Sequence, residues 1–388
     1  MGILANTVSI CQFRVEGTPP DGDLAAWAGE RLATQAFRSI EKGSEELSIG
    51  WVHLDDHQRS DFSDPSAYAR DHYLTFTLRR DQRRVPAALL KAHLVRAEQD
   101  FLAANSNFQR VPKAKREELK EAVRGALLAR TLPVPSVWDL VWDTRSQTAT
   151  FSALSGKVVD LCDGLFKQTF DGLRLVPITP FARGRSVIPA ELEGSLERAN
   201  RATGDGLLEE LRDNQWLGAE FLLWLAWRAL TGEGQYQVNR PGPAVTGETF
   251  SAWLDDRLIL TGGAEGGQKV AVTGPQDRYE EMRTALAAEK SLAEAVLHLE
   301  KAEHQWRLNL KAGTFHLASF RCPGVKLEKD DLTDPQREKE AVFYERMAIL
   351  EEGEQLFDSL LADFLALRLT TGWNGAEEAI RAWLAAGD

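Results

Sequence analysis

This chain of 388 residues contains very little cysteine. Its three cysteines, Cys11, Cys162 and Cys322, lie far apart, and none belongs to a CxxC pair. Such spacing argues against a disulfide framework and against a thiolate metal site. It is typical of reduced thiols in a cytoplasmic protein, and we expect no cofactor.

The sequence also lacks a hydrophobic run long enough to span a bilayer. Its most apolar stretch, WLGAEFLLWLAWRAL at 216–230, is too short and carries Glu220 and Arg228. The N-terminal MGILANTVSICQFRV has neither the positive leader nor the apolar run of a signal peptide. We therefore expect a cytoplasmic protein without membrane contact.

Familiar catalytic motifs are absent. TGGAEGGQKV at 261–270 resembles a phosphate-binding loop, but Gln268 interrupts the motif and Val270 replaces the required hydroxyl residue. Its glycines instead predict a hairpin turn. No GxSxG or HExxH pattern occurs, so the sequence gives no positive support for an enzyme.

One short segment keeps an enzymatic alternative open. HLDDHQ at 53–58 gathers His53, Asp55, Asp56 and His57. Imidazole and carboxylate groups are common metal ligands, so a metal-dependent nuclease is one hypothesis. No partner cluster elsewhere in the sequence completes such a site.

Charge is distributed unevenly. The chain has a formal net charge of −12, yet residues 79–130 hold thirteen Lys/Arg and six Asp/Glu, a local charge of +7. The remainder therefore carries −19. A basic block in an acidic chain is typical of a nucleic-acid surface, and it also occurs in helices with solvated charges.

The centre of this block is VPKAKREELKEAVRGALLARTLP, 111–133, which predicts a helix. Four of its cations recur at spacings of three and four and so share one face: Lys113, Arg116, Lys120 and Arg124. Leu119 and Val123 lie on another face, which we expect to dock on the core. Glu117 and Glu121 could pair with these cations instead. Any DNA contact would involve phosphates and depend little on sequence. The candidate DNA-binding residues are Arg79, Arg80, Arg83, Arg84, Lys113, Lys115, Arg116, Lys120, Arg124, Arg183 and Arg185.

Alternating and helical hydrophobic patterns succeed one another along the chain. Alternation predicts strands at 4–15, 46–54 and 71–84, and hairpins at 137–154, 255–274 and 304–320. Helical spacing predicts helices at 23–37, 86–104, 113–129, 156–170, 276–301 and 335–369. Hairpins mixed with long helices favour an α+β fold with mixed or antiparallel sheets.

Composition suggests three consecutive regions. They are an N-terminal α+β region at 1–185, a helical and hairpin region at 186–300, and a C-terminal hairpin with a long helix at 301–388. The middle region contains the aromatic residues Trp216, Phe221, Trp224 and Trp227, whose helical face favours a core. An exposed interface for another protein is the alternative, which would make the chain an interaction module without DNA binding.

Three stretches in this order resemble the RdgC family of recombination-associated proteins. The first stretch is IGWVHL at 49–54. The second is KAKREELKEAVRGALLARTLP, followed by VWDLVWDTRSQTATFSA and then by GLRLVPITPF. The third is WRLNLKAGTFHLASF together with the long helix after it. The resemblance covers about residues 1–181 and 300–369. The chain departs from the family at His53-Leu54, where a Pro-Pro pair is expected, and in its middle region.

The resemblance implies an α+β fold assembled as a ring-shaped homodimer around double-stranded DNA. It further implies sequence-independent binding that limits access of the RecA recombinase, association with the nucleoid, and no catalysis. Whether the ring opens, whether RecA is touched directly, and whether single or double strands are preferred do not follow from the sequence.

Overall fold

The computed structural model describes residues 2–20, 22–43, 45–204, 206–262, 267–275, 278–326 and 335–385. Its helices and antiparallel strands confirm the predicted α+β class. The chain divides into two compact units: unit 1 comprises Met1–Val15, Thr148–Val159 and Leu175–Asp388, and unit 2 comprises Glu16–Gln147 and Asp160–Arg174. Neither unit is one continuous stretch of sequence, because the chain leaves unit 1 twice and returns to it twice.

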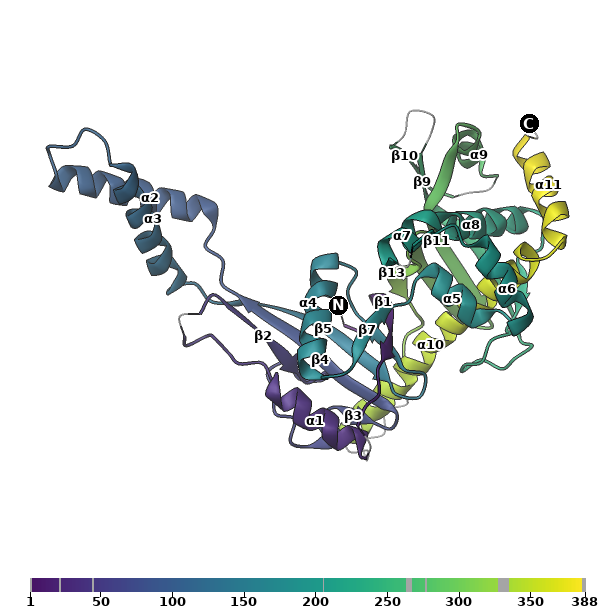
Figure 1. The fold of residues 1–388 in the computed structure, drawn as a ribbon, viewed down its shortest axis with the longest axis horizontal. Coiled ribbons are helices and arrows are strands. Elements are labelled where there is room, and N and C mark those ends of the chain that lie inside the picture. Colours follow the sequence, from purple (N-terminus) through teal and green to yellow (C-terminus); the bar gives the residue numbers. More distant parts are fainter. Residues whose placement is uncertain are drawn as a thin grey trace. The chain divides into compact units, whose positions relative to one another are not determined.

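Unit 2 is a small antiparallel sheet with helices. Its strands follow the order β2–β4–β5, with the short β3 paired to β4. Figure 1 shows α2 and α3 as a hairpin that leaves the sheet after β4 and returns to it at β5. The elements are α1 (Leu24–Thr34), β2 (Leu47–Val52), η1 (Pro65–Ala67), β3 (Ala69–Arg70), β4 (Tyr73–Gln82), α2 (Ala87–Ala104), α3 (Lys113–Leu128), β5 (Val134–Asp143) and most of α4 (Gly156–Thr169).

An aromatic cluster fills one face of this sheet. Trp51 on β2 meets Phe76 on β4 edge-on at 4.7 Å between ring centroids, and Trp142 on β5 meets Phe166 and Phe170 in the same way. All five side chains are fully buried, and the Trp51 indole donates a hydrogen bond to Thr169 at 2.7 Å. Large aromatic rings, one from each of three strands, therefore pack α4 against the sheet.

Unit 1 has a larger sheet covered by helices. Its strands follow the order β10–β9–β11–β12–β13–β1–β6, with β7 paired to β1 and β8 to β9. The strands are β1 (Thr7–Glu16), β6 (Thr148–Phe151), β7 (Arg174–Pro177), β8 (Gln235–Gln237), β9 (Thr249–Gly262), β10 (Gln268–Thr273), β11 (Lys290–Lys301), β12 (His304–Lys311) and β13 (His316–Arg321). The helices are α5 (Pro180–Val187), α6 (Ala190–Ala199), α7 (Leu207–Asp213), α8 (Gln215–Leu230), α9 (Glu280–Ala287), α10 (Pro335–Arg368) and α11 (Gly372–Ala385).

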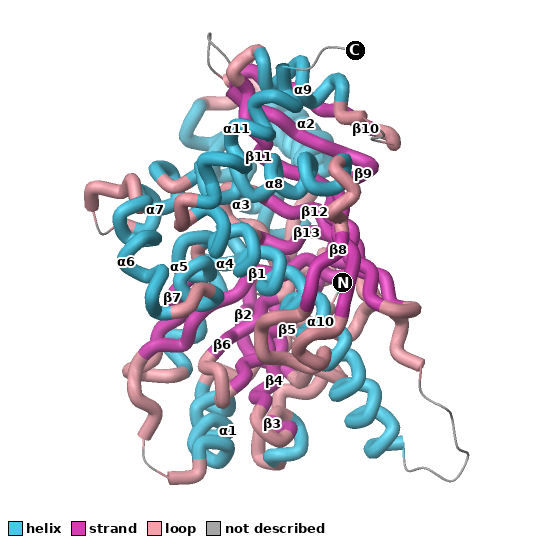
Figure 2. The backbone as a smooth tube through the Cα atoms, turned by 90° about the vertical axis from the view of Figure 1, so that its right-hand side faces the viewer, coloured by secondary structure: helices cyan, strands magenta, loops and turns pink. Residues whose placement is uncertain are grey.

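Helices α8 and α10 bury one face of the unit 1 sheet, and Figure 2 shows α8 against β11. The Trp306 indole on β12 donates to the Ile349 carbonyl of α10 at 2.9 Å. A side chain in place of Gly353 would meet Trp306 and Phe320 at 2.7 Å, so glycine permits this close approach.

The aromatic residues of α8 form part of this core. Trp216, Phe221 and Trp224 are buried, which confirms the core interpretation for them, while Trp227 keeps partial exposure. Phe221 contacts Phe357 and Phe364 on α10 at 5.8 and 5.6 Å between ring centroids. No helix among the described residues is long and apolar enough to cross a membrane.

Most predicted elements are confirmed within a few residues, but the helix expected at 276–301 is wrong. Its described part contains the short helix α9 and then the strand β11, which pairs with β9 on one side and β12 on the other. Leu297 and Leu299 point into the core and alternate with His298 and Glu300. Sheet pairing on both edges thus overrides the helical propensity of the Ala, Glu, Leu and Lys residues in this segment. The first two predicted residues, 276 and 277, lie outside the described chain.

The hairpin predicted at 255–274 is confirmed by the pairing of β9 with β10. The tip of this hairpin, residues 263–266 of the phosphate-loop-like segment, lies outside the described residues.

Candidate nucleic-acid interface

The basic block forms a helical hairpin in unit 2, which we call the arm (residues 87–130). Its helices α2 and α3 pack against each other and contribute only one buried side chain, Leu128. The expectation that α3 docks on the core is therefore wrong. Leu119 and Val123 are half-buried, and the helix that packs against α3 is α2.

A buried arginine secures the base of the arm. Arg83, just beyond β4, donates from Nη1 to the Leu128 carbonyl of α3 at 3.1 Å. Its Nη2 donates to the carbonyls of Ile40, Glu41 and Gly43 at 2.6–3.1 Å. The cation thus binds the Leu128 carbonyl at the C-terminus of α3 and links the base of the arm to the segment before β2. Since Arg83 is buried, we exclude it from the candidate surface.

The arm carries a net charge of +4, from nine Lys/Arg and five Asp/Glu. Four of its cations form ion pairs with carboxylates. These pairs are Lys115–Glu118 at 2.6 Å, Arg116–Glu98 at 2.6 Å, Lys120–Glu117 at 3.4 Å and Arg124–Glu46 at 2.7 Å. Exposed pairs of this kind contribute little, so phosphates could replace the carboxylates at small cost.

The remaining five arm cations have no ion-pair partner among the described residues. They are exposed on α2, on α3 and in the segments that follow them: Lys91, Arg96, Arg110, Lys113 and Arg130. Only Lys113 was predicted as a contact. The others fall outside the single helical stripe considered in the sequence, although the basic block contained them.

Two aromatic side chains lie where α2 meets the loop to α3. Phe101 and Phe108 approach to 5.9 Å between ring centroids, and Lys115 Nζ lies 5.9 Å from the Phe101 ring. Phe108 is exposed. This end of the arm thus presents an apolar surface close in sequence to Arg110 and Lys113.

The predicted contact residues on β4 and directly after it have mainly structural roles. Arg79 is buried and forms two hydrogen bonds of 2.8 Å with Asp81, and it also donates to the His57 carbonyl. Arg80 is half-buried over the Trp138 ring, and Arg84 is exposed beside Gln82. Only Arg84 is well placed to extend the cationic surface of the arm.

The two predicted arginines of α5 belong to unit 1, not to the unit that carries the arm. Arg183 is buried and pairs with Asp358 at 2.5 Å, while Arg185 pairs with Glu197 on the surface. We exclude Arg183 because its guanidinium is enclosed. Arg185 remains exposed, but a carboxylate partially neutralises it.

The residues of HLDDHQ have separate partners. The His53 ring contacts the Asp61 carbonyl, Asp55 pairs with Arg70, and His57 lies 4.0 Å from Asp139. Within the described ranges, no group of three or more His, Cys, Asp or Glu side chains is placed to hold a metal ion.

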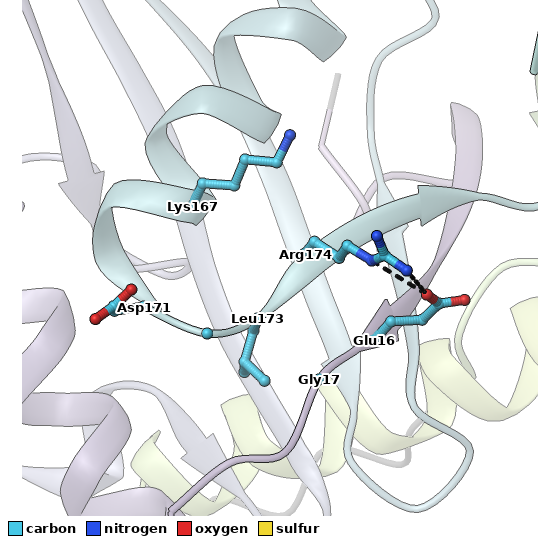
Figure 3. A pocket seen from close by; sticks show the side chains of 7 residues that line it. Glu16, Gly17, Lys167, Asp171, Leu173 and Arg174 are labelled. Atoms are coloured by element: carbon cyan, nitrogen blue, oxygen red, sulfur yellow. Dashed lines mark hydrogen bonds and ion pairs between the residues drawn. The ribbon is translucent and has the colours of Figure 1, made fainter. Parts of the chain in front are cut away.

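A cavity of about 490 Å³ also lies in unit 2, and Figure 3 shows its lining. Arg174 pairs with Glu16 at 2.6 Å, and Lys167 pairs with Asp163 at 2.6 Å. Gly17 adopts φ +117°, and a side chain there would meet the Gly172 carbonyl at 2.2 Å. Because both lining cations are paired, the cavity does not extend the cationic surface.

These features define an α+β protein that carries a cationic helical hairpin on an antiparallel sheet. Residues 20–188, which include the whole arm, match the family described as "Putative exonuclease, RdgC". The match covers less than half of the chain, and over these residues it supports the resemblance to the RdgC family and a recombination-associated role. The resemblance at 300–369 lies outside the matched residues and stays a prediction. No curated protein matches the chain.

Proposed function

We propose that this protein binds double-stranded DNA without sequence preference and that the arm supplies the contacts. The observation that carries the proposal is the set of exposed cations on a projecting hairpin of net charge +4, five of which have no ion-pair partner within the described ranges. Lysine and arginine side chains bind DNA by displacing condensed counterions from phosphates. The acidic remainder of the chain would repel the same polyanion and confine it to the arm.

We further propose that two copies assemble as a ring around the duplex and thereby limit access of RecA to DNA. The RdgC match, which includes the whole arm, supports this proposal. Encirclement would retain DNA topologically, which contact energy alone does not achieve. The protein would then act at the nucleoid without a cofactor and without catalysis.

A salt series tests the binding mode. If all five unpartnered arm cations reach phosphates, the slope of log K against log salt should be about −4.5 per protomer. The affinity for a random-sequence duplex should then fall by roughly several hundredfold per protomer between 50 and 200 mM salt, and by roughly 10⁵-fold for a dimer that binds through both arms. Fluorescence anisotropy with labelled duplex would measure this decrease, and salt-insensitive binding would refute a phosphate-based interface. The solution mass, measured in parallel, should be that of a dimer, and a monomer that binds equally well would refute encirclement.

The family description names an exonuclease, so DNA cleavage is the second candidate function. Incubation of linear duplex and plasmid DNA with Mg²⁺ or Mn²⁺ distinguishes the two functions. The binding proposal predicts intact DNA at protein concentrations that saturate binding. Progressive shortening from the ends that is lost on His57→Ala would instead favour an enzyme.

A further inference from the structure

Unit 1 contains a buried acid–base network that joins three of its elements. Gln12 on β1 donates from Nε2 to Glu354 Oε2 on α10 at 2.9 Å. The Gln12 Oε1 accepts from Arg183 Nη1 on α5 at 2.8 Å, and Arg183 Nε donates to Asp358 Oδ1 on α10 at 2.5 Å. A single chain of hydrogen bonds thus holds β1 and α5 against α10.

The carboxyl group of Glu354 is the unusual member of this network. The residue retains some exposure, but its Oε1 is sealed from solvent and has no hydrogen-bond partner among the residues that the structure describes. Burying this oxygen without a partner costs free energy when the carboxyl group is ionised, because a buried negative charge requires hydrogen bonds or a close cation. Arg183, whose charge acts on Glu354, is already bonded to Asp358, and its guanidinium carbon lies 4.9 Å from the centre of the Phe357 ring.

The charged surroundings of Glu354 favour a neutral carboxyl. Burial raises the pKa of Glu354 to about 7, Arg183 opposes this rise, and Glu351 and Asp358 add to it. Although burial acts to lower it, the carboxylate of Asp358 raises the pKa of Arg183, so α5 contributes a permanent cation. From the segment after β13, burial raises the pKa of Cys322 to about 11, so its thiol stays neutral.

The elements held by this network lie close to points where the chain leaves or enters unit 1. Gln12 lies three residues before Val15, where the first segment of unit 1 ends. Helix α5 begins five residues after Leu175, where the last segment of unit 1 starts. In addition, the Ile178 backbone N–H donates to the Gln12 carbonyl at 3.0 Å. The network therefore holds two of the four segments by which unit 1 connects to the rest of the chain.

We infer that Glu354 is a proton-dependent latch that holds β1 and α5 on α10 when neutral and loosens them when ionised. The ionised form would place a second carboxylate, that of Glu354, beside Asp358 against the single guanidinium of Arg183. Opening would admit water to Oε1 and relieve this excess of negative charge. Since a shift across neutral pH changes the protonation state, the latch would respond to physiological pH.

Hydrogen exchange tests this inference in the full-length protein. An opened segment releases the proton that the folded state retains, so opening should become easier as pH rises and should level off above the folded pKa. After correction for intrinsic exchange rates, protection of peptides covering 7–15 and 178–187 should fall about tenfold between pH 6 and pH 8. The isosteric Glu354→Gln variant should abolish this decrease.

Glu345→Gln provides the matched control, because Glu345 lies on the same helix and is exposed. This variant should behave like the unmodified protein. The latch is refuted if Glu354→Gln keeps the tenfold pH dependence, or if the unmodified protein shows no loss of protection in these peptides. The second outcome requires no variant, so a folding defect in Glu354→Gln cannot obscure the result. DNA affinity is not involved, so the test is independent of the proposed function.

Discussion

Replacing three arm cations, as Arg96→Gln, Arg110→Gln and Lys113→Gln in one protein, should weaken duplex binding by about 500-fold per protomer at 100 mM salt. The salt slope should fall from about −4.5 to about −1.8 per protomer, because three phosphate contacts are lost. All three side chains are exposed, and none has an ion-pair partner among the described residues. The free energy of unfolding should therefore change by less than about 0.5 kcal/mol.

A matched variant controls for net charge. Arg14, Arg257 and Lys269 are exposed cations of unit 1 that also lack an ion-pair partner in the described part of the chain. Glutamine at these three positions removes the same charge, yet should lower affinity by no more than a few-fold, because long-range attraction is screened at this salt concentration. Equal losses in the two triple variants would show that overall charge, and not the arm, determines binding.

Breaking the buried Arg79–Asp81 pair should have the largest effect on stability. Arg79→Met leaves the Asp81 carboxylate, which is only 2% exposed, without its bidentate partner. We expect the free energy of unfolding to fall by about 3–5 kcal/mol, measured by urea denaturation, because an unpaired buried charge remains. DNA affinity of the protein that remains folded should be unchanged.

The double variant Arg79→Met/Asp81→Leu separates charge burial from packing. Removing both partners eliminates the uncompensated charge, so a large part of the lost stability should return. A double variant as unstable as Arg79→Met would show that other Arg79 contacts, such as the hydrogen bond to the His57 carbonyl, hold this region together.

The sequence predicted the elements whose hydrophobic pattern has one clear period. The alternation at 71–84 and the helical spacing at 113–129 both correspond to observed elements, β4 and α3. The strand β11 was missed because its composition favours a helix, and its pairing with two other strands depends on residues far away in the chain.

The location of the candidate site was also predictable, but its individual side chains were not. The basic block coincides with the arm, since clustered charge is visible in sequence. Arg124 pairs with Glu46, which lies 78 residues earlier, and Arg83 turns inward to four carbonyls. Such tertiary partners determine which cations stay free, and local spacing contains no information about them.

Site-specific photo-crosslinking tests the central claim most directly. A benzophenone side chain at Ala114, an exposed position on α3, should crosslink to a bound random-sequence duplex at low salt. The same group at Ala271, an exposed position on β10 of unit 1, should give only background. Crosslinking at Ala271 without crosslinking at Ala114, in proteins that both bind DNA, would contradict the assignment of the arm as the DNA interface.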